Sequence, residues 1–112
     1  MTNTTQRFRE IAALNDQART SFTGCRVFIT CGISDLPELI QDQILRKVRA
    51  FDTFTPDNDP YGEHDFGAFD HGGERIFWKI DYYDTQLKHG SPDPADPEVT
   101  TRVLTILLAD EW

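Results

Sequence analysis

The sequence has no long apolar run and only two cysteines among its 112 residues. No stretch approaches the roughly 18 apolar residues that a membrane-spanning helix needs. The N-terminal segment also lacks the apolar core that is typical of a secretion signal. We therefore expect a cytoplasmic protein that does not bind membranes. Internal repeats and low-complexity tracts are absent too, and the length suits a single domain over residues 1–112.

Basic residues are scarce, because 11 Lys and Arg stand against 19 Asp and Glu, for a formal net charge of −8. A general nucleic-acid binder needs the opposite balance to neutralise phosphates, so we do not expect direct nucleic-acid binding. The acidity is concentrated in the second half: residues 1–50 carry a net charge of +2 and residues 51–112 a net charge of −10. Such a distribution suits a partner with a basic surface, a bound cation, or solubility alone.

The two cysteines lie at the ends of a β-branched and aromatic run that predicts a strand over residues 25–31. An extended strand would hold Cys25 and Cys31 about 20 Å apart. A disulfide requires Cα atoms within about 7 Å, so the two cannot pair. We expect free, half-buried thiols, and neither has a neighbouring histidine that could activate it as a nucleophile.

Two amphipathic helices are predicted in the first half of the chain. Apolar residues at near-helical spacing predict the first helix over residues 5–20. A four-residue recurrence predicts the second over roughly 36–50, through Leu36, Ile40, Ile44 and Val48. Asp35 and Glu38 have the form of a capping box at its start. A loop rich in Asp, Asn, Pro and Gly follows from 52 to 63.

A two-glycine turn at residues 71–74 predicts a β-hairpin that joins 64–70 to 75–83. In this register Phe66 faces Lys79 and His64 faces Asp81. The alternation of side chains predicts a core face with Phe69, Ile76, Trp78, Ile80 and Tyr82. The opposite face then carries His64, Phe66, Asp70, Arg75, Phe77, Lys79, Asp81 and Tyr83.

Prolines at three positions in residues 91–97 exclude helix and central strand there and predict a rigid, extended connector. Asp96 then has the character of a helix N-cap, with Pro97 at the first helical position. The spacing of the apolar residues that follow predicts a C-terminal helix over 97–110. Because β-branched residues are frequent here, a strand over 102–108 is the alternative.

Together these elements predict one α+β domain, in which two or three helices pack on a small antiparallel sheet. The sheet is built around the 64–83 hairpin, and the strand at 25–31 joins it.

A candidate catalytic group lies on the outer face of the predicted hairpin. Asp81 opposite His64 would fix the imidazole tautomer and prepare a general base, and Lys79 one pleat away would stabilise an oxyanion. No nucleophile is near in sequence, so any reaction would use water. The competing interpretation is a structural His–Asp pair on a sheet surface.

The acidic loop offers hard oxygen ligands and one imidazole, from Asp57, Asp59, Asp65 and His64. Against the calcium-loop pattern, however, Tyr61 occupies the fifth position and Ala68 the twelfth, where the bidentate carboxylate should stand. We therefore favour a network of Asx turns, in which side chains accept hydrogen bonds from nearby backbone amides, and expect no cofactor.

Three segments resemble a family of small bacterial proteins of unknown function that are often encoded on plasmids and other mobile elements. They are FDTFTPDNDPYGEHDFG at residues 51–67, FWKIDYYD at 77–84 and GSPDPADPEVTTRVLTILLADEW at 90–112. The resemblance implies a bacterial, intracellular, mobile-element setting and no mechanism. By analogy, small acidic proteins in that setting include antagonists of host defence, such as inhibitors of CRISPR or restriction complexes that imitate the charge of DNA.

Our leading hypothesis is a non-enzymatic protein whose acidic second half docks on a basic surface of another protein. The candidate partner-binding residues are Asp57, Asp59, Glu63, Phe66, Asp81, Tyr83 and Asp84. The alternatives are a small hydrolase that depends on a metal or on the His64–Asp81 pair, and a structural or interaction domain without a defence-related role.

Overall fold

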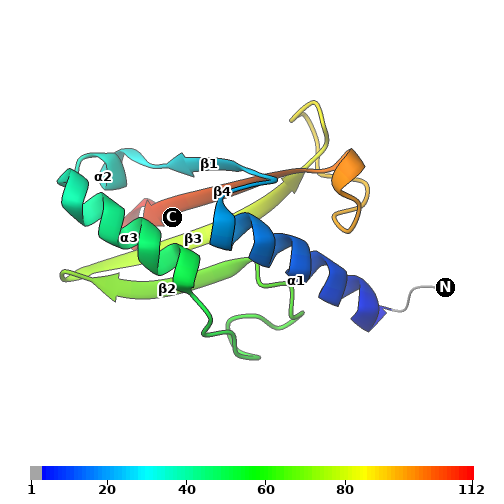
Figure 1. The fold of residues 1–112 in the computed structure, drawn as a ribbon, viewed down its shortest axis with the longest axis horizontal. Coiled ribbons are helices and arrows are strands. Elements are labelled where there is room, and N and C mark those ends of the chain that lie inside the picture. Colours follow the sequence, from blue (N-terminus) through cyan, green and yellow to red (C-terminus); the bar gives the residue numbers. More distant parts are fainter. Residues whose placement is uncertain (1–3) are drawn as a thin grey trace.

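The computed structural model describes residues 4–112 and shows a twisted four-stranded sheet with two long helices on one face (Figure 1). In chain order the elements are α1 (Thr4–Ser21), β1 (Arg26–Ile29), α2 (Cys31–Ser34), α3 (Glu38–Ala50), β2 (Phe66–His71), β3 (Glu74–Tyr83), η1 (Pro97–Val99), β4 (Thr101–Leu108) and η2 (Ala109–Glu111), where η marks a 3₁₀ turn. Residues 1–3, part of the segment judged to lack a secretion signal, lie outside the described residues. Within residues 4–112, no helix is both long enough and apolar enough to cross a membrane.

The strands follow the order β1-β4-β3-β2. β3 pairs antiparallel with β2 and with β4, as predicted for a sheet built around the hairpin. β1 instead runs parallel to β4, with Arg26 opposite Val103, so the sheet is mixed rather than purely antiparallel. The α+β fold class is confirmed, and the first strand joins the sheet at its edge.

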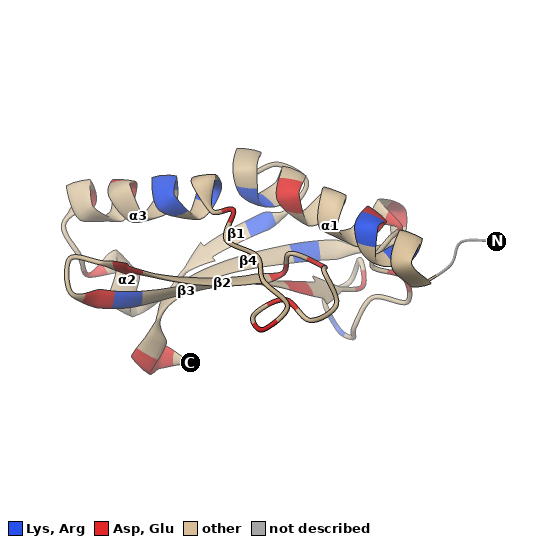
Figure 2. Ribbon diagram, turned by 90° about the horizontal axis from the view of Figure 1, so that it is seen from below, with Lys and Arg blue, Asp and Glu red and all other residues tan. Residues whose placement is uncertain are grey.

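The core lies between the sheet and the helices α1 and α3, which cover the same face (Figure 2). Trp78 at the centre of β3 has no exposed surface. The fully buried residues around it come from α2, α3, β3 and β4: Ile33, Ile44, Val48, Ile76, Leu104 and Ile106. Burying a side chain of this size contributes about 1.5–3 kcal/mol relative to leaving it exposed, so this layer is a principal stabilising feature.

The two predicted helices are confirmed as α1 and α3, but the predicted capping box is wrong. Pro37, in an extended conformation, is the N-cap of α3, and no side chain caps that end. Asp35 instead ends α2. The first strand is shorter than predicted, because Cys31 already begins α2. Both cysteines are free as expected; Cys25 is half-buried, whereas Cys31 is exposed.

The hairpin register is confirmed over its full paired length, from Phe66 opposite Lys79 to His71 opposite Glu74. The predicted core face is also confirmed at its centre, since Ile76, Trp78 and Ile80 are buried. The pairing stops at Phe66, however, and the predicted extension to residue 64 is absent. Because the candidate catalytic group needs His64 in the hairpin opposite Asp81, this difference bears directly on that group.

The predicted C-terminal helix is wrong, and the alternative, a strand, is what the structure contains. β4 lies between β1 and β3, so its backbone groups pair on both sides. Residues 91–97 are not an extended connector, because the backbone turns where the Asp96 amide donates to the Asp93 carbonyl (2.9 Å). The predicted cap is present on a shorter element: Asp96 Oδ1 accepts from the Glu98 amide (2.9 Å) at the start of η1.

Candidate functional site

The structure does not bring the predicted catalytic residues together. Lys79 and Asp81 form an ion pair with each other (2.8 Å) on the sheet face that α1 and α3 leave uncovered. His64 lies outside β2, and its positive φ of 56° turns the chain away from the strand direction. The predicted pair of His64 with Asp81 is therefore wrong.

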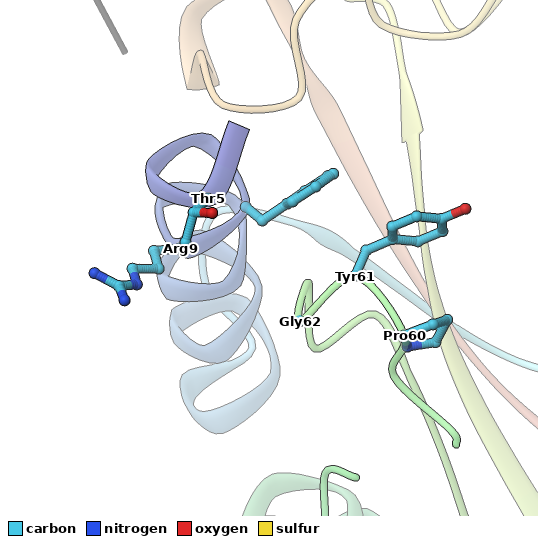
Figure 3. A pocket seen from close by; sticks show the side chains of 6 residues that line it. Thr5, Arg9, Pro60, Tyr61 and Gly62 are labelled. Carbon is cyan, nitrogen blue, oxygen red and sulfur yellow. The ribbon is translucent and has the colours of Figure 1, made fainter. Parts of the chain in front are cut away.

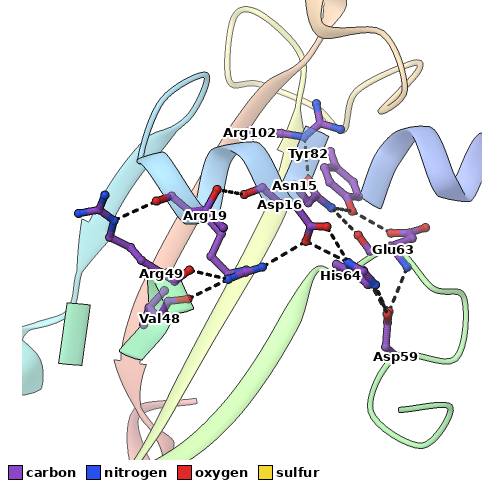
Figure 4. A network of polar contacts seen from close by, with 11 residues as sticks. Asn15, Asp16, Arg19, Val48, Arg49, Asp59, Glu63, His64, Tyr82 and Arg102 are labelled. Carbon is purple, nitrogen blue, oxygen red and sulfur yellow. Dashed lines mark hydrogen bonds and ion pairs between the residues drawn. The ribbon is translucent and has the colours of Figure 1, made fainter. Parts of the chain in front are cut away.

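His64 is instead held on the helix side of the molecule by two carboxylates (Figure 4). An aromatic ring also contacts the imidazole. Its Nδ1 lies 2.9 Å from Oδ1 of Asp16, a residue of α1. Its Nε2 lies 3.7 Å from Oδ2 of Asp59. The imidazole also stacks flat on Phe54, with ring centroids 3.9 Å apart and an interplanar angle of 5°. These contacts fasten the loop before β2 to α1.

Asp59 organises the acidic loop by accepting backbone hydrogen bonds, as the predicted Asx-turn network requires. Its carboxylate accepts from the amides of Glu63 (3.0 Å) and His64 (3.2 Å), and the residue is 7 % exposed. Asn58 Oδ1 similarly accepts from the Thr55 amide (3.0 Å). Across residues 4–112, no group of three or more His, Cys, Asp or Glu side chains is arranged to hold a metal ion.

A second polar contact chain runs from α1 to β3 and β4 beneath this loop. Asn15 is fully buried and donates to the Tyr82 hydroxyl (2.8 Å) and to the Glu63 carbonyl (3.0 Å). The Tyr82 hydroxyl donates to Glu63 Oε2 (2.8 Å), and burial raises the pKa of Tyr82 above its ordinary value. Arg102 Nε donates to Asn15 Oδ1 (2.7 Å). The side chains of Asn15, Tyr82 and Glu63 satisfy one another in this network, which fits a structural role for these three residues.

Among the carboxyl groups of residues 4–112, Asp65 has the pKa that this environment alters most. Burial, followed by the negative charge of Glu63, raises the pKa of Asp65 to about 6. A carboxyl group with such a pKa exchanges its proton near neutral pH, which is the property of a general acid.

Two open hollows flank the turn at residues 60–62. One, of about 380 Å³, lies between that turn and the first turns of α1, where Phe8 contacts Tyr61 at a ring-centroid distance of 5.6 Å (Figure 3). The other, of about 420 Å³, is bordered by Phe54, Asp59 and His64. Arg9 points away from Tyr61 in the first hollow, so no charged group converges there on a ligand position.

The sheet face opposite α1 and α3 carries outward side chains from all four strands, and we call it the open face. Its members include Arg26 and Phe28 of β1, Phe66 of β2, Phe77, Lys79, Asp81 and Tyr83 of β3, and Val103 and Thr105 of β4. At one end η2 lies against it (Figure 2). The rings of Phe66 and Phe77 lie 5.2 Å apart, and the Trp112 ring lies 5.7 Å from each of them.

Glu111 fixes the position of η2 and thus of the tryptophan that follows it. Its carboxylate accepts from the Thr30 hydroxyl (2.6 Å), the Leu108 amide (2.9 Å) and the Gly32 amide (3.0 Å). The hydrogen bond from Thr30 contributes most to lowering the pKa of Glu111. Trp112 is held in this way over the sheet while 67 % of its surface stays exposed.

The seven predicted partner-binding residues separate into three groups. Phe66, Asp81 and Tyr83 share the open face. Asp59 and Glu63 belong to the polar network on the helix side. Asp57 is exposed on the loop, and Asp84 accepts the amides of Gln86 (3.1 Å) and Lys88 (3.0 Å), which closes the turn after β3.

Sequence patterns missed three residues that shape these surfaces. Asn15 and Asp16 had no signal, because a polar residue on a predicted amphipathic helix is ordinarily assigned to solvent. Trp112 lies beyond the helix predicted over 97–110 and was assigned no role, although a large aromatic at the end of an apolar run is itself a signal for an anchor. Only the tertiary arrangement brings Asp16 to His64 and Trp112 to Phe66.

Residues 29–111 match a protein family described as a protein of unknown function, DUF3768. The chain belongs to this family. The DUF3768 match contains α2, α3, β2, β3, β4 and η2, whereas α1 with Asp16 lies before it and Trp112 after it. Comparisons with curated proteins and with solved structures found no match.

Proposed function

We propose that the protein binds another protein through the open face of its sheet. The observation that carries this proposal is the aromatic cluster of Phe66, Phe77 and Trp112 on a face that α1 and α3 leave uncovered. Phe28 at 53 % and Tyr83 at 36 % exposure extend the cluster toward both ends of the sheet. Exposed aromatic side chains gathered on one face mark protein-binding surfaces, where they act as anchors.

The size of the open face bears on whether it can form a specific interface. The four strands have 4, 6, 10 and 8 residues, so a rise of about 3.3 Å per residue and a strand spacing of about 4.8 Å give a footprint of roughly 440 Å². A standard interface buries about 800 Å² of accessible surface on each partner. Because protruding side chains such as Trp112 add accessible area to the footprint, the open face supplies a large part of such an interface.

The charge of the protein defines the chemistry of the partner. With a net charge of −8, the protein repels acidic surfaces and attracts basic ones over about one Debye length, roughly 8–10 Å at physiological salt. Asp81 lies on the open face itself, paired with Lys79. Because the open face also carries Arg26 and Lys79, the negative charge lies around it rather than on it. The partner surface we propose is an apolar patch, with lysine and arginine outside its rim.

The resemblance to proteins of mobile elements supports a partner class. Host-defence complexes that handle nucleic acids, such as CRISPR and restriction complexes, present basic surfaces of this kind. Inhibition of such a complex is the specific form of our proposal. The hydrolase alternative lacks comparable support, because His64 lies apart from the Lys79–Asp81 pair.

Site-specific crosslinking tests the proposal. A photoreactive phenylalanine analogue at position 28 or 83 should capture a partner in cells of the source organism. The control is the same analogue at position 39 on α3, where Leu39 is 67 % exposed on the helix side. With the captured partner purified, we expect Trp112→Ala to weaken binding at least 30-fold, as the loss of an interface anchor of about 2 kcal/mol predicts. Leu39→Ala should leave affinity unchanged.

Two results would contradict the proposal. One is crosslinking from position 39 to the same partner with the same yield as from positions 28 and 83. The other is unchanged affinity of the Trp112→Ala protein. Affinity that does not fall with added salt would refute the electrostatic part alone, because attraction between exposed charges is screened.

A further inference from the structure

A separate hollow of about 300 Å³ lies on the helix side, at the junction of α1, the turn that precedes β1, and the start of β4. α1 contributes Leu14 and Gln17, and the turn contributes residues 23 and 24. Pro97 and Thr100 border the opposite side, and Arg102 of β4 completes the lining. The hollow thus combines apolar walls with hydroxyl and amide groups and one cation.

Arg102 is a buried cation without a carboxylate partner among the described residues. It is 3 % exposed; its Nε donates to Asn15 (2.7 Å) and its Nη2 to the Pro94 carbonyl. Its guanidinium lies 5.3 Å from the centroid of the Tyr82 ring. Nη1 has no hydrogen-bond partner in residues 4–112. It is not one of the fully buried side-chain atoms without a partner, which are Arg19 Nε and Trp78 Nε1, so it is accessible to solvent.

The carboxylates that could neutralise Arg102 are engaged elsewhere. Asp93, in the segment that precedes η1, pairs with Arg7 (2.7 Å). Glu63 is close enough for its charge to raise the pKa of Arg102, but its carboxylate accepts the Tyr82 hydroxyl (2.8 Å) and no ion pair joins it to Arg102 in residues 4–112. The other buried arginine, Arg19, differs in this respect, because Asp16 lies 3.2 Å from its guanidinium.

A buried charge that contacts no carboxylate is costly, since it loses hydration and gains only the weaker attraction of a more distant opposite charge. The cost is visible in the titration of the group, because burial lowers the pKa of Arg102. An anion bound in the hollow would neutralise the charge of Arg102, and Nη1 is the guanidinium nitrogen available to donate to it.

We propose that this hollow binds a small organic carboxylate, with the carboxylate on Arg102 and the apolar part against Leu14 and Pro97. One free guanidinium nitrogen and one positive charge match a monoanion. A phosphate dianion would leave surplus negative charge in a chain whose net charge is already −8. This site is independent of the open face, which lies on the other side of the sheet.

Titration with a homologous series of carboxylates tests this assignment. Acetate, propionate and isobutyrate are added at constant ionic strength to the ¹⁵N-labelled protein, with chloride and inorganic phosphate as comparators. We expect saturable amide shifts confined to residues 14–24 and 94–102. Each added carbon buried against the apolar walls should increase affinity about three- to fourfold.

Because replacing Arg102 itself could unfold the protein, the decisive variant is Gln17→Glu. The introduced carboxylate would compete for Arg102 and repel the ligand, so affinity should fall at least tenfold. Gln86→Glu, on the loop after β3, changes the net charge equally and should bind like the parent. The proposal is overturned if no carboxylate saturates, if phosphate or chloride produces the same shifts, or if both variants lose affinity equally.

Discussion

Replacing Asp65 with asparagine should stabilise the protein at neutral pH. Asp65 lies directly before β2, and its carbonyl accepts the Ile80 amide (2.8 Å), so the backbone holds it in place whatever its side chain. Burial and the charge of Glu63 raise its carboxyl pKa from an ordinary 3.8 to about 6. The charged carboxylate is therefore a destabilising group, which asparagine removes with little change in shape.

The direction in which stability changes with pH follows from proton binding by Asp65 in the folded and the unfolded state. Between pH 4 and 6 the folded protein keeps a proton on Asp65 that the unfolded chain has released, so stability falls as pH rises through this window. A pKa difference of about 2 between the two states corresponds to about 3 kcal/mol of unfolding free energy before solvent screening is considered. Since Asp65 is only partly buried, solvent screening reduces the expected gain from Asp65→Asn to about 1–2 kcal/mol at pH 7–8.

Urea denaturation of both proteins at unit intervals from pH 4 to pH 8 measures this effect. The difference in unfolding free energy should be smallest at pH 4 and reach its plateau above pH 7. Asp57→Asn, on the exposed part of the same loop, serves as the control and should show no such profile. A difference that is constant with pH would refute the electrostatic cause, and destabilisation at pH 7 would refute the whole account.

Two further substitutions test the packing and the capping. Gly67→Ala would place a Cβ 2.3 Å from Trp78 Nε1 and should destabilise the protein by about 1–3 kcal/mol. The control is Gly90→Ala, whose Cβ would meet nothing closer than 3.9 Å and which should melt like the parent. Equal melting temperatures of the two variants would contradict the packing described. Asp96→Ala removes the acceptor for the Glu98 amide and should cost about 1 kcal/mol, measured by thermal denaturation. An unchanged midpoint would show that η1 needs no cap.

Local patterns in the sequence predicted the elements whose structure depends on near neighbours. The helices α1 and α3 follow from residues three and four apart, and the hairpin register follows from a glycine turn that only one pairing can close. The C-terminal segment was assigned incorrectly for a physical reason. β4 is a central strand in which Ile106 is fully buried, Leu107 beside it is only 4 % exposed, and Val103 and Thr105 on the open face are partly buried. Such a strand lacks polar alternation and is hard to distinguish from a helix by spacing alone.

The sequence by itself determined the charge, the α+β class, the hairpin and the Asx network around Asp59, because these depend on composition or on contacts within a few residues. Only the tertiary structure decided which side chains meet. His64 bonds to Asp16, β1 pairs with β4, and Trp112 packs on Phe66, each across dozens of residues. No local pattern records such contacts, because their energy is gained only when the helices and the sheet have packed together.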